Sequence, residues 1–213
     1  MSVVLVGSNP GLVLFAPGDD KAAAPVAAAS LWTVDWSVWG FGTVLIAVHD
    51  GQWRIVGQDE HLGRILWDRF TRHFPELAPF AAVADVRQVT APVQLRADLG
   101  SGLQASGGGI EMRLSEVKQR RQYINLAFEL GDITLAVSNV YAPCQSGELE
   151  IDGRRVPGEV HCGESGGQWS SSGYLAMAEV WRDPTDRLQL GDSVRSSIFA
   201  GADPRHLRAL GSR

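Results

Sequence analysis

The serine at position 165 has the sequence surroundings of a catalytic nucleophile. Residues 163–167 read GESGG, which places Ser165 in the G-x-S-x-G spacing that hydrolases use to expose a nucleophilic hydroxyl. Such a serine needs a base to accept its proton and a second group to orient that base. His49 and Asp85 are candidates for these two roles elsewhere in the chain. Because the chain contains 24 glycines, the same spacing also arises in flexible loops, and we favour the loop interpretation.

Three short segments resemble the catalytic segments of chymotrypsin-like serine proteases. GESGG is similar to the GDSGG around the nucleophile of that family, VLIAVHDG to its histidine segment, and ADVRQVTAPV to its aspartate segment. The resemblance implies that Ser165 attacks, His49 is the base and Asp85 orients it. It also implies that the amides of Gly163 and Ser165 bind the oxyanion. A serine hydrolase in a chymotrypsin-like barrel is therefore one alternative function.

A second set of candidates comes from the later strand-like segments and from the aromatic residues. In YINLAFEL, strand alternation places Tyr123, Asn125 and Glu129 on one face. If Glu129 faces an apolar interior, its pKa rises and it becomes a usable general acid or base. The chain also has 7 tryptophans, many large side chains for one small domain. We expect some aromatic residues to line a ligand cavity, and our candidates are Trp36, Trp39, Tyr141 and Trp169.

The residues that could bind a metal or a phosphate do not form a recognisable motif. Cys144, His161, Cys162 and Glu164 are ligand types, but adjacent His and Cys side chains have poor geometry and no C-x-x-C unit is present in the sequence. The glycine-rich segment GSGLQASGGG lacks the Gly-Lys-Ser/Thr of a P-loop. We therefore expect neither a metal nor a cofactor.

The composition limits the partners and the compartment. A formal net charge of −5 and a pI near 5.5 argue against broad binding to nucleic acid or to anionic membranes. Two cysteines are too few for a disulfide framework, and the first residues lack the pattern of a signal peptide, so we expect a cytoplasmic protein. The basic residues are nearly all arginine, which suggests a GC-rich bacterial genome. The sequence leaves a homo-oligomer open.

Secondary-structure signals are strongest in the first third of the chain. In LWTVDWSVWG, alternation places Trp32, Val34 and Trp36 on one strand face. Residues 44–56 predict a hairpin that turns at Asp50-Gly51, a pair suited to a type I′ turn. Asp59 is the expected N-cap of a helix over about residues 59–74, which Pro75 ends. At the N-terminus, VVLV and LVLF around GSNPG suggest another hairpin.

Beyond residue 81 the chain reads as many short strands with close turns. Residues 111–122 and 171–182 also contain many helix formers, so helices there are an open alternative that would give an α+β fold. The preferred fold class is mainly β, a single domain over residues 1–213 built as an antiparallel curved sheet or barrel with at least one packed α-helix.

This fold class is compatible with several functions. Our first hypothesis is a β-barrel-like protein that binds an apolar small molecule, extended to a cofactor-independent isomerase, cyclase or hydratase that acts on it. The alternatives are the serine hydrolase and a noncatalytic binding or scaffold protein. Fold alone does not choose among them, because function resides in the site.

Overall fold

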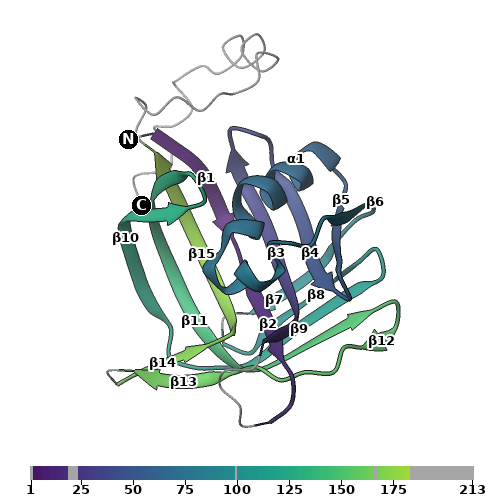
Figure 1. Cartoon of the computed structure of the whole chain (residues 1–213). Coiled ribbons are helices and arrows are strands. Elements are labelled where there is room, and N and C mark those ends of the chain that lie inside the picture. The colour runs from purple at the N-terminus through teal and green to yellow at the C-terminus, as the bar shows by residue number, and fades with distance from the viewer. Residues whose placement is uncertain (1, 19–23, 99, 166, 183–213) are drawn as a thin grey trace. The chain divides into compact units, whose positions relative to one another are not determined.

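The computed structural model describes residues 2–18, 24–98, 100–165 and 167–182. These residues belong to one compact unit that ends at Arg182, and they form a mainly β fold dominated by one large curved sheet (Figure 1). The predicted fold class is therefore confirmed. The part of the predicted single domain that covers residues 183–213 lies outside the described residues. In the described part, no helix has the length and apolar character needed to cross a membrane.

The strands of the first half are short to medium in length, and they are β1 (Ser2–Ser8), β2 (Gly11–Phe15), β3 (Pro25–Ser37), β4 (Gly42–His49), β5 (Gln52–Gly57), β6 (Asp85–Thr90), β7 (Gln94–Asp98) and β8 (Gly102–Gly107). The second half contains the longest strand, β11, and its strands are β9 (Ile110–Val117), β10 (Arg121–Leu130), β11 (Ile133–Ile151), β12 (Arg154–Arg155), β13 (Cys162–Ser165), β14 (Gln168–Ser171) and β15 (Gly173–Arg182). Helical turns between β5 and β6 are α1 (Glu60–Ile65), the π-helix η1 (Leu66–Phe70) and the 3₁₀ turns η2 (Thr71–His73) and η3 (Pro75–Phe80).

The main sheet has the strand order β6-β5-β4-β3-β1-β15-β11-β9-β8-β7, and β10 is also paired with β11. Neighbouring strands are antiparallel except β5 and β6, which are parallel. The helical turns connect these two strands, and such a crossover brings a chain back in the same direction. The prediction of an antiparallel sheet thus needs one correction, because the sheet is mixed at this edge.

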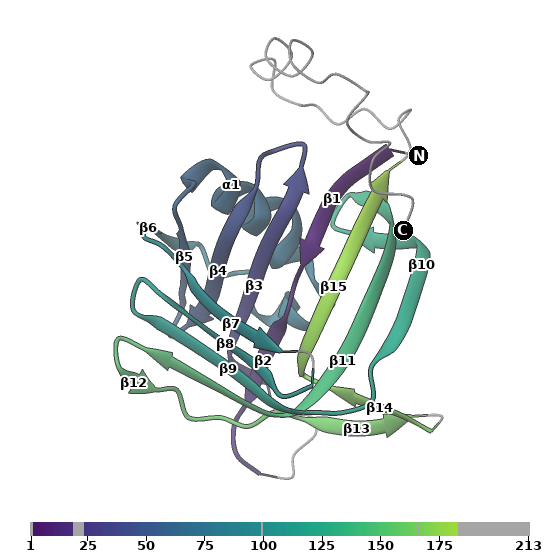
Figure 2. The ribbon, with the colours of Figure 1, turned by 180° about the vertical axis from the view of Figure 1, so that it is seen from behind.

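The sheet folds over on itself, so that β3, β4 and β5 pack against β8, β9 and the second half of β11. Figure 2 shows β7, β8 and β9 crossing in front of β3 and β4. Apolar side chains from both layers, such as Leu31, Leu45 and Met112, form the buried cluster between them. Arg54 of β5 also joins the layers, because its Nη1 and Nη2 donate to the two carboxylate oxygens of Asp152 at 2.8 and 2.9 Å. This bidentate pair lowers the pKa of Asp152.

The opposite face of β3, β4 and β5 is covered by residues 60–80, which we call the helical layer (Figure 1). Asp59 caps α1 as predicted, because its Oδ1 accepts a hydrogen bond from the amide of Leu62 at 2.9 Å. The predicted length of 59–74 is wrong for an α-helix, which ends at Ile65 and continues as π and 3₁₀ turns. Buried aromatic side chains of these turns pack on the sheet, and this packing overrides helix propensity.

Two turns predicted from the sequence have different outcomes. The hairpin of β4 and β5 is confirmed, since His49 pairs with Gln52 and both Asp50 and Gly51 have the positive φ of a type I′ turn. The N-terminal hairpin is wrong. β1 and β2 are both antiparallel to β3 in continuous register, with Ser8 opposite Thr33 and Gly11 opposite Ser30. β1 and β2 therefore run in the same direction along β3 and are separated only by Asn9 and Pro10, where the strand is interrupted but the chain does not reverse.

The segments left open between strand and helix are strands. Residues 111–122 lie mainly in β9 and β10, and residues 171–182 mainly in β15. The alternative α+β fold with helices in these two segments is therefore wrong. Both segments pair with β11 over most of their length. Long-range ladder bonds thus outweigh the local preference for helix.

Candidate ligand-binding cavity

A cavity of about 490 Å³ lies between the helical layer and the adjoining half of the sheet. We call the side of β10, β11 and β15 that borders it the inner face. Two-residue spacing along β11 and β15 places alternate side chains on this face. The cavity is lined by Asn9, Trp32, Phe70, Phe74, Pro75, Glu76, Arg121, Tyr123, Phe128, Leu130, Leu135, Val137, Asn139, Tyr141, Ser171, Ser172, Tyr174, Ala176, Ala178 and Val180.

Two alanines in the middle of β15 provide the space for this cavity. On the inner face of β15 the order of side chains is Tyr174, Ala176, Ala178 and Val180. Small side chains at the two central positions leave room above the sheet, while the larger ones at each end bound it. Ala178 lies opposite Asn139 of β11 in the ladder. The floor of the cavity is thus set by the size of the residues at 176 and 178.

Aromatic side chains form the wall contributed by the helical layer and β3. Trp32 packs edge-to-face on Phe70 with ring centroids 5.6 Å apart, and it stacks near Phe74 at 6.1 Å. Its indole Nε1 donates to the hydroxyl of Thr71 at 2.9 Å, and both residues are buried. These contacts fix the orientation of the indole. The aromatic wall is therefore preformed, as ligand pockets usually are.

The other end of the cavity is polar and is organised by two tyrosines. Tyr174 donates to Oε1 of Glu76 at 3.0 Å, and Tyr141 donates to the carbonyl oxygen of Ser171 at 3.1 Å. The Arg121 guanidinium lies 5.0 Å from the ring centroid of Tyr141. Loss of solvation is the main cause that raises the pKa of both tyrosines, and Glu76 raises the pKa of Tyr174 further. Both phenols are therefore neutral hydrogen-bond donors near pH 7.

Asn139 lies where the apolar and polar parts of the inner face meet. On β11 it follows Leu135 and Val137 and precedes Tyr141. Its Oδ1 is buried and has no hydrogen-bond partner among the described residues. A buried amide oxygen without a partner is uncommon, because burial removes its bonds to water. Asn139 therefore carries an acceptor without a partner that is enclosed within the protein.

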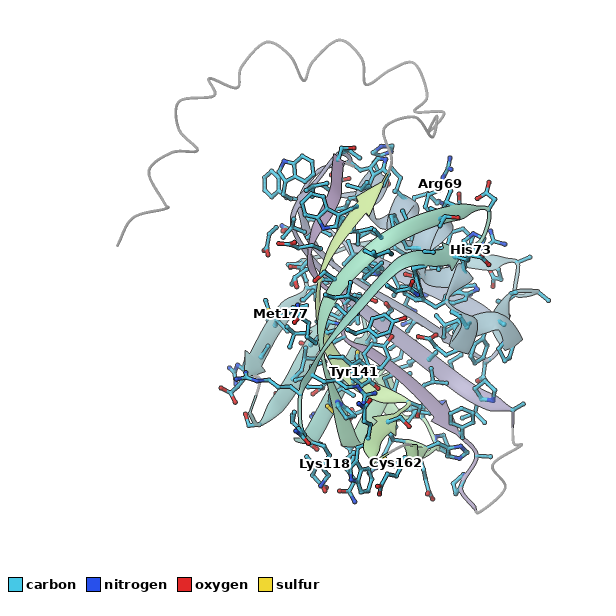
Figure 3. The ribbon with its side chains drawn as sticks, turned by 90° about the vertical axis from the view of Figure 1, so that its left-hand side faces the viewer. Arg69, His73, Lys118, Tyr141, Cys162 and Met177 are labelled. Carbon is cyan, nitrogen blue, oxygen red and sulfur yellow. The ribbon has the colours of Figure 1, made fainter. Side chains whose placement is uncertain are left out.

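Of the residues predicted to bind a ligand, Tyr141 lines the cavity and lies on the inner side of β11 (Figure 3). Trp36 lies elsewhere, 49% exposed, because Asp35 is an extra residue in β3 between the pairs Val6–Trp36 and Gly7–Val34. This bulge reverses which face the following side chains occupy. The strand face predicted to hold Trp32, Val34 and Trp36 therefore ends before Trp36.

Two further tryptophan candidates also lie away from the cavity lining. Trp39 is partly buried and packs edge-to-face on Phe70, with centroids 5.5 Å apart. Trp169 in β14 is 42% exposed, and its backbone carbonyl accepts a hydrogen bond from Nη1 of Arg121 at 2.7 Å. Its contribution near the cavity is thus through the backbone, which ties β14 to β10.

The candidate acid or base Glu129 is exposed and is not among the residues that line the cavity. A second bulge explains its position. In β10, Asn125 pairs with Val137 but Phe128 pairs with Leu135, so β10 has one residue more than β11 over this stretch. The inner face passes from Tyr123 to Phe128, and Glu129 falls on the outer face. The predicted common face of Tyr123, Asn125 and Glu129 is therefore interrupted.

No contact among the described residues joins Ser165, His49 and Asp85, the three residues of the hydrolase alternative. Nε2 of His49 lies 3.3 Å from the Asp50 carboxylate, and Asp85 accepts a hydrogen bond from Gln52 at 2.7 Å. Ser165 ends β13, which pairs with β14 in a separate two-stranded sheet rather than forming an irregular loop. In Figure 1 this hairpin and β6 lie at opposite sides of the molecule. The side chain of Ser165 lies outside the described residues.

The candidate metal ligands Cys144 and Cys162 are neighbours, and the thiol of Cys162 donates to the carbonyl oxygen of Cys144 at 4.0 Å. Cys144 is buried, Cys162 is exposed, and the ring of His161 stacks on Phe15 with centroids 4.0 Å apart. Among the described residues, no group of three or more His, Cys, Asp or Glu side chains is placed to hold a metal ion. The side chains of Cys144 and His161 instead contribute to packing.

Several cavity residues were missed by the sequence analysis. They include Phe70, Phe74, Arg121, Tyr174 and Ala178. A signal was present in GYLAMAEV, where alternation of Tyr174, Ala176, Ala178 and Val180 marks one strand face with a small centre. That signal was hidden because the segment also suits a helix.

Comparison with protein-family models, with curated proteins and with solved structures found no match to this chain. The arguments about function below therefore rest on the residues and geometry of the cavity.

Proposed function

We propose that the protein binds one apolar small molecule in the cavity between the inner face and the helical layer. The observation that carries the proposal is the space above Ala176 and Ala178, closed by the aromatic wall of Trp32, Phe70 and Phe74. Its volume of about 490 Å³ lies in the range of ligand pockets in proteins. Apolar walls with a few polar groups at one end are also typical of such pockets.

The polar groups favour binding over proton transfer. A base that abstracts a proton from an apolar substrate needs a pKa near the working pH. The raised pKa of Tyr174 keeps the phenol protonated, and its hydrogen bond goes to Glu76. Glu129, the acid or base expected from the sequence, faces away from the cavity. We therefore propose a binding protein rather than an isomerase, cyclase or hydratase.

The test is a comparison of two phenylalanine substitutions on β15, with N-phenyl-1-naphthylamine as a neutral fluorescent probe. Wild-type protein is expected to bind the dye saturably at one site and to gain thermal stability by linkage. Ala178→Phe places a ring in the cavity, and displacing even two buried CH₂ equivalents of ligand weakens binding by about tenfold or more. Titration of dye fluorescence measures the dissociation constant of each variant.

Met177→Phe is the matched control, because Met177 neighbours Ala178 in the chain but lies on the outer face, 48% exposed (Figure 3). It should leave dye affinity unchanged. Equal binding to wild type, Ala178→Phe and Met177→Phe would place the dye outside the cavity and contradict the proposal. Failure of the wild-type protein to bind any of a panel of apolar dyes would contradict it as well.

A further inference from the structure

We infer that the natural ligand is an elongated apolar molecule that ends in a single carboxylate, and that this carboxylate pairs with the guanidinium of Arg121. The inference rests on the proposed function and adds the chemical class of the ligand. Among the described residues, Arg121 is the only basic residue that lines the cavity. A charged group at one end of an otherwise apolar pocket fixes the orientation and the charge of what binds there.

The protein holds the guanidinium of Arg121 in place and leaves most of its donors free. Nη1 donates to the backbone carbonyl of Trp169 at 2.7 Å, and the guanidinium carbon lies 5.0 Å from the ring centroid of Tyr141. The ion pairs of the described residues do not include Arg121. A guanidinium has five N–H donors in a planar fork that matches the two oxygens of a carboxylate. An oriented arginine without a counterion is therefore suited to bind one.

Glu76 is the acidic residue of the same lining, and it limits the charge of the ligand. Its Oε1 accepts from Tyr174 at 3.0 Å, and the residue is exposed, so its own charge is solvated by a phenol and by water. It does not require a cationic group on the ligand. A phosphate monoester carries about two negative charges, of which one arginine balances only one. A carboxylate, with one charge, fits the pair of Arg121 and Glu76 better.

Tyr123 adds a neutral donor on the same side of the cavity. It lies two residues after Arg121 on β10, and strand alternation places both on the inner face. Its hydroxyl accepts a hydrogen bond from Nδ2 of Asn125 at 3.0 Å and keeps its own hydrogen for another acceptor. A neutral hydroxyl can bind carboxylates, carbonyls and alcohols alike. The charge of the head group is therefore selected by Arg121.

The ladder shows where the apolar part of the ligand would lie. Arg121, Tyr141 and Ala176 occupy one row across β10, β11 and β15. From this row the space above the sheet continues over Ala178 to Val180, where the inner face is apolar. A carboxylate at Arg121 thus leaves its apolar body in the part of the cavity that the two alanines open.

The experiment uses four compounds with the same unbranched chain, which are dodecanoate, dodecanol, dodecylamine and dodecyl phosphate, at pH 8 and below their micelle concentrations. Competition with N-phenyl-1-naphthylamine gives their dissociation constants for wild type and Arg121→Leu. The dodecanoate-to-dodecanol affinity ratio is compared between the two proteins, because the alcohol reports on the cavity without the charge. The ratio is expected to fall about tenfold in Arg121→Leu, the equivalent of one charge-assisted contact, while dodecanol binding persists. Dodecylamine and dodecyl phosphate should bind wild type more weakly than dodecanoate.

Two further variants separate a contact from net charge and from folding. Arg120→Leu removes the same charge at the neighbouring residue, which is exposed and does not line the cavity, and it should keep the wild-type ratio. Arg121→Lys keeps the charge without the planar fork, so its ratio should fall less than that of Arg121→Leu. If loss of the bond to Trp169 only loosens β14, both ligands weaken and the ratio stays constant. In wild type, added NaCl should weaken dodecanoate relative to dodecanol, because salt screens a partly exposed charge pair.

The outcomes distinguish the two proposals. If the ratio is the same in wild type and Arg121→Leu, the carboxylate inference is wrong and the binding function stands. An equal fall in Arg120→Leu and Arg121→Leu would assign the effect to net charge and would also overturn the inference. Tighter wild-type binding of dodecylamine or dodecyl phosphate than of dodecanoate would do the same. If neither the dye nor any of the four compounds binds, the proposed function itself is wrong.

Discussion

The hydrogen bond between Trp32 and Thr71 fastens the aromatic wall of the cavity to the sheet. It joins the indole Nε1 to the threonine hydroxyl at 2.9 Å, with exposed fractions of 3% and 1% for the two residues. Thr71→Val keeps the shape of the side chain and removes the acceptor. The indole N–H then has no partner in an apolar site, which costs roughly 2 kcal/mol of unfolding free energy. For a unit of this size, that corresponds to a fall of about 4–8 °C in melting temperature.

Urea unfolding followed by tryptophan fluorescence and circular dichroism measures this loss. Thr134→Val is the control, since Thr134 is exposed on β11, and it should change stability by less than about 0.5 kcal/mol. A double-mutant cycle with Trp32→Phe isolates the hydrogen bond. In the Trp32→Phe background, which has no indole donor, Thr71→Val should be nearly neutral. Dye affinity should also fall in Thr71→Val, because Trp32 lines the cavity.

Two results would refute this reasoning. A stability loss below about 0.5 kcal/mol for Thr71→Val would show that the indole finds another partner or water. Equal losses in the wild-type and Trp32→Phe backgrounds would show that the effect of Thr71→Val does not depend on the Trp32 donor.

Two further predictions concern strand packing and the buried thiol. Gly7→Ala should lower the free energy of unfolding in urea by about 2–3 kcal/mol, because the new Cβ would lie 2.0 Å from the carbonyl oxygen of Thr33. Gly163→Ala is the neutral control, since its Cβ would have its nearest contact at 3.6 Å. Equal losses in the two variants would disprove the steric argument. Burial raises the pKa of Cys144 from its ordinary value of 9.0 to about 11, so the thiol's contribution to stability is complete below pH 9 and is lost as the pH rises to about 11. Unfolding curves between pH 7 and 11 should show a smaller loss of unfolding free energy at alkaline pH for Cys144→Ala than for wild type. The part of the loss that comes from ionisation of the buried tyrosines should remain in both proteins. An identical loss in both proteins would contradict the assignment to Cys144.

Local features of the fold were readable where a few adjacent residues decide the conformation. Asp50 and Gly51 both tolerate positive φ, so the turn between β4 and β5 followed from two residues. Asp59 has a short carboxylate that can accept from an amide three residues ahead, which fixed the start of α1. The length of α1 did not follow, because packing of aromatic side chains on the sheet ended the regular helix.

The faces of the strands could be predicted only up to the bulges. Alternation assigns Trp36 and Glu129 correctly if each strand is regular, but an extra residue in β3 and another in β10 reverse the two faces. A bulge depends on the register between two strands that are distant in sequence. The sequence of one strand does not contain that information.

By itself, the sequence determined that this protein is mainly β, where its clearest hairpin turns and where its helix begins, since these depend on alternation and on capping or turn residues that are neighbours in the chain. Only the tertiary structure decided which residues share the cavity. Trp32, Asn139 and Ala178 come from three different strands, and Phe74 and Glu76 come from the helical layer. Their proximity is a consequence of long-range pairing along β11 and β15 and of packing against the helical layer, because only those contacts leave a space above two alanines.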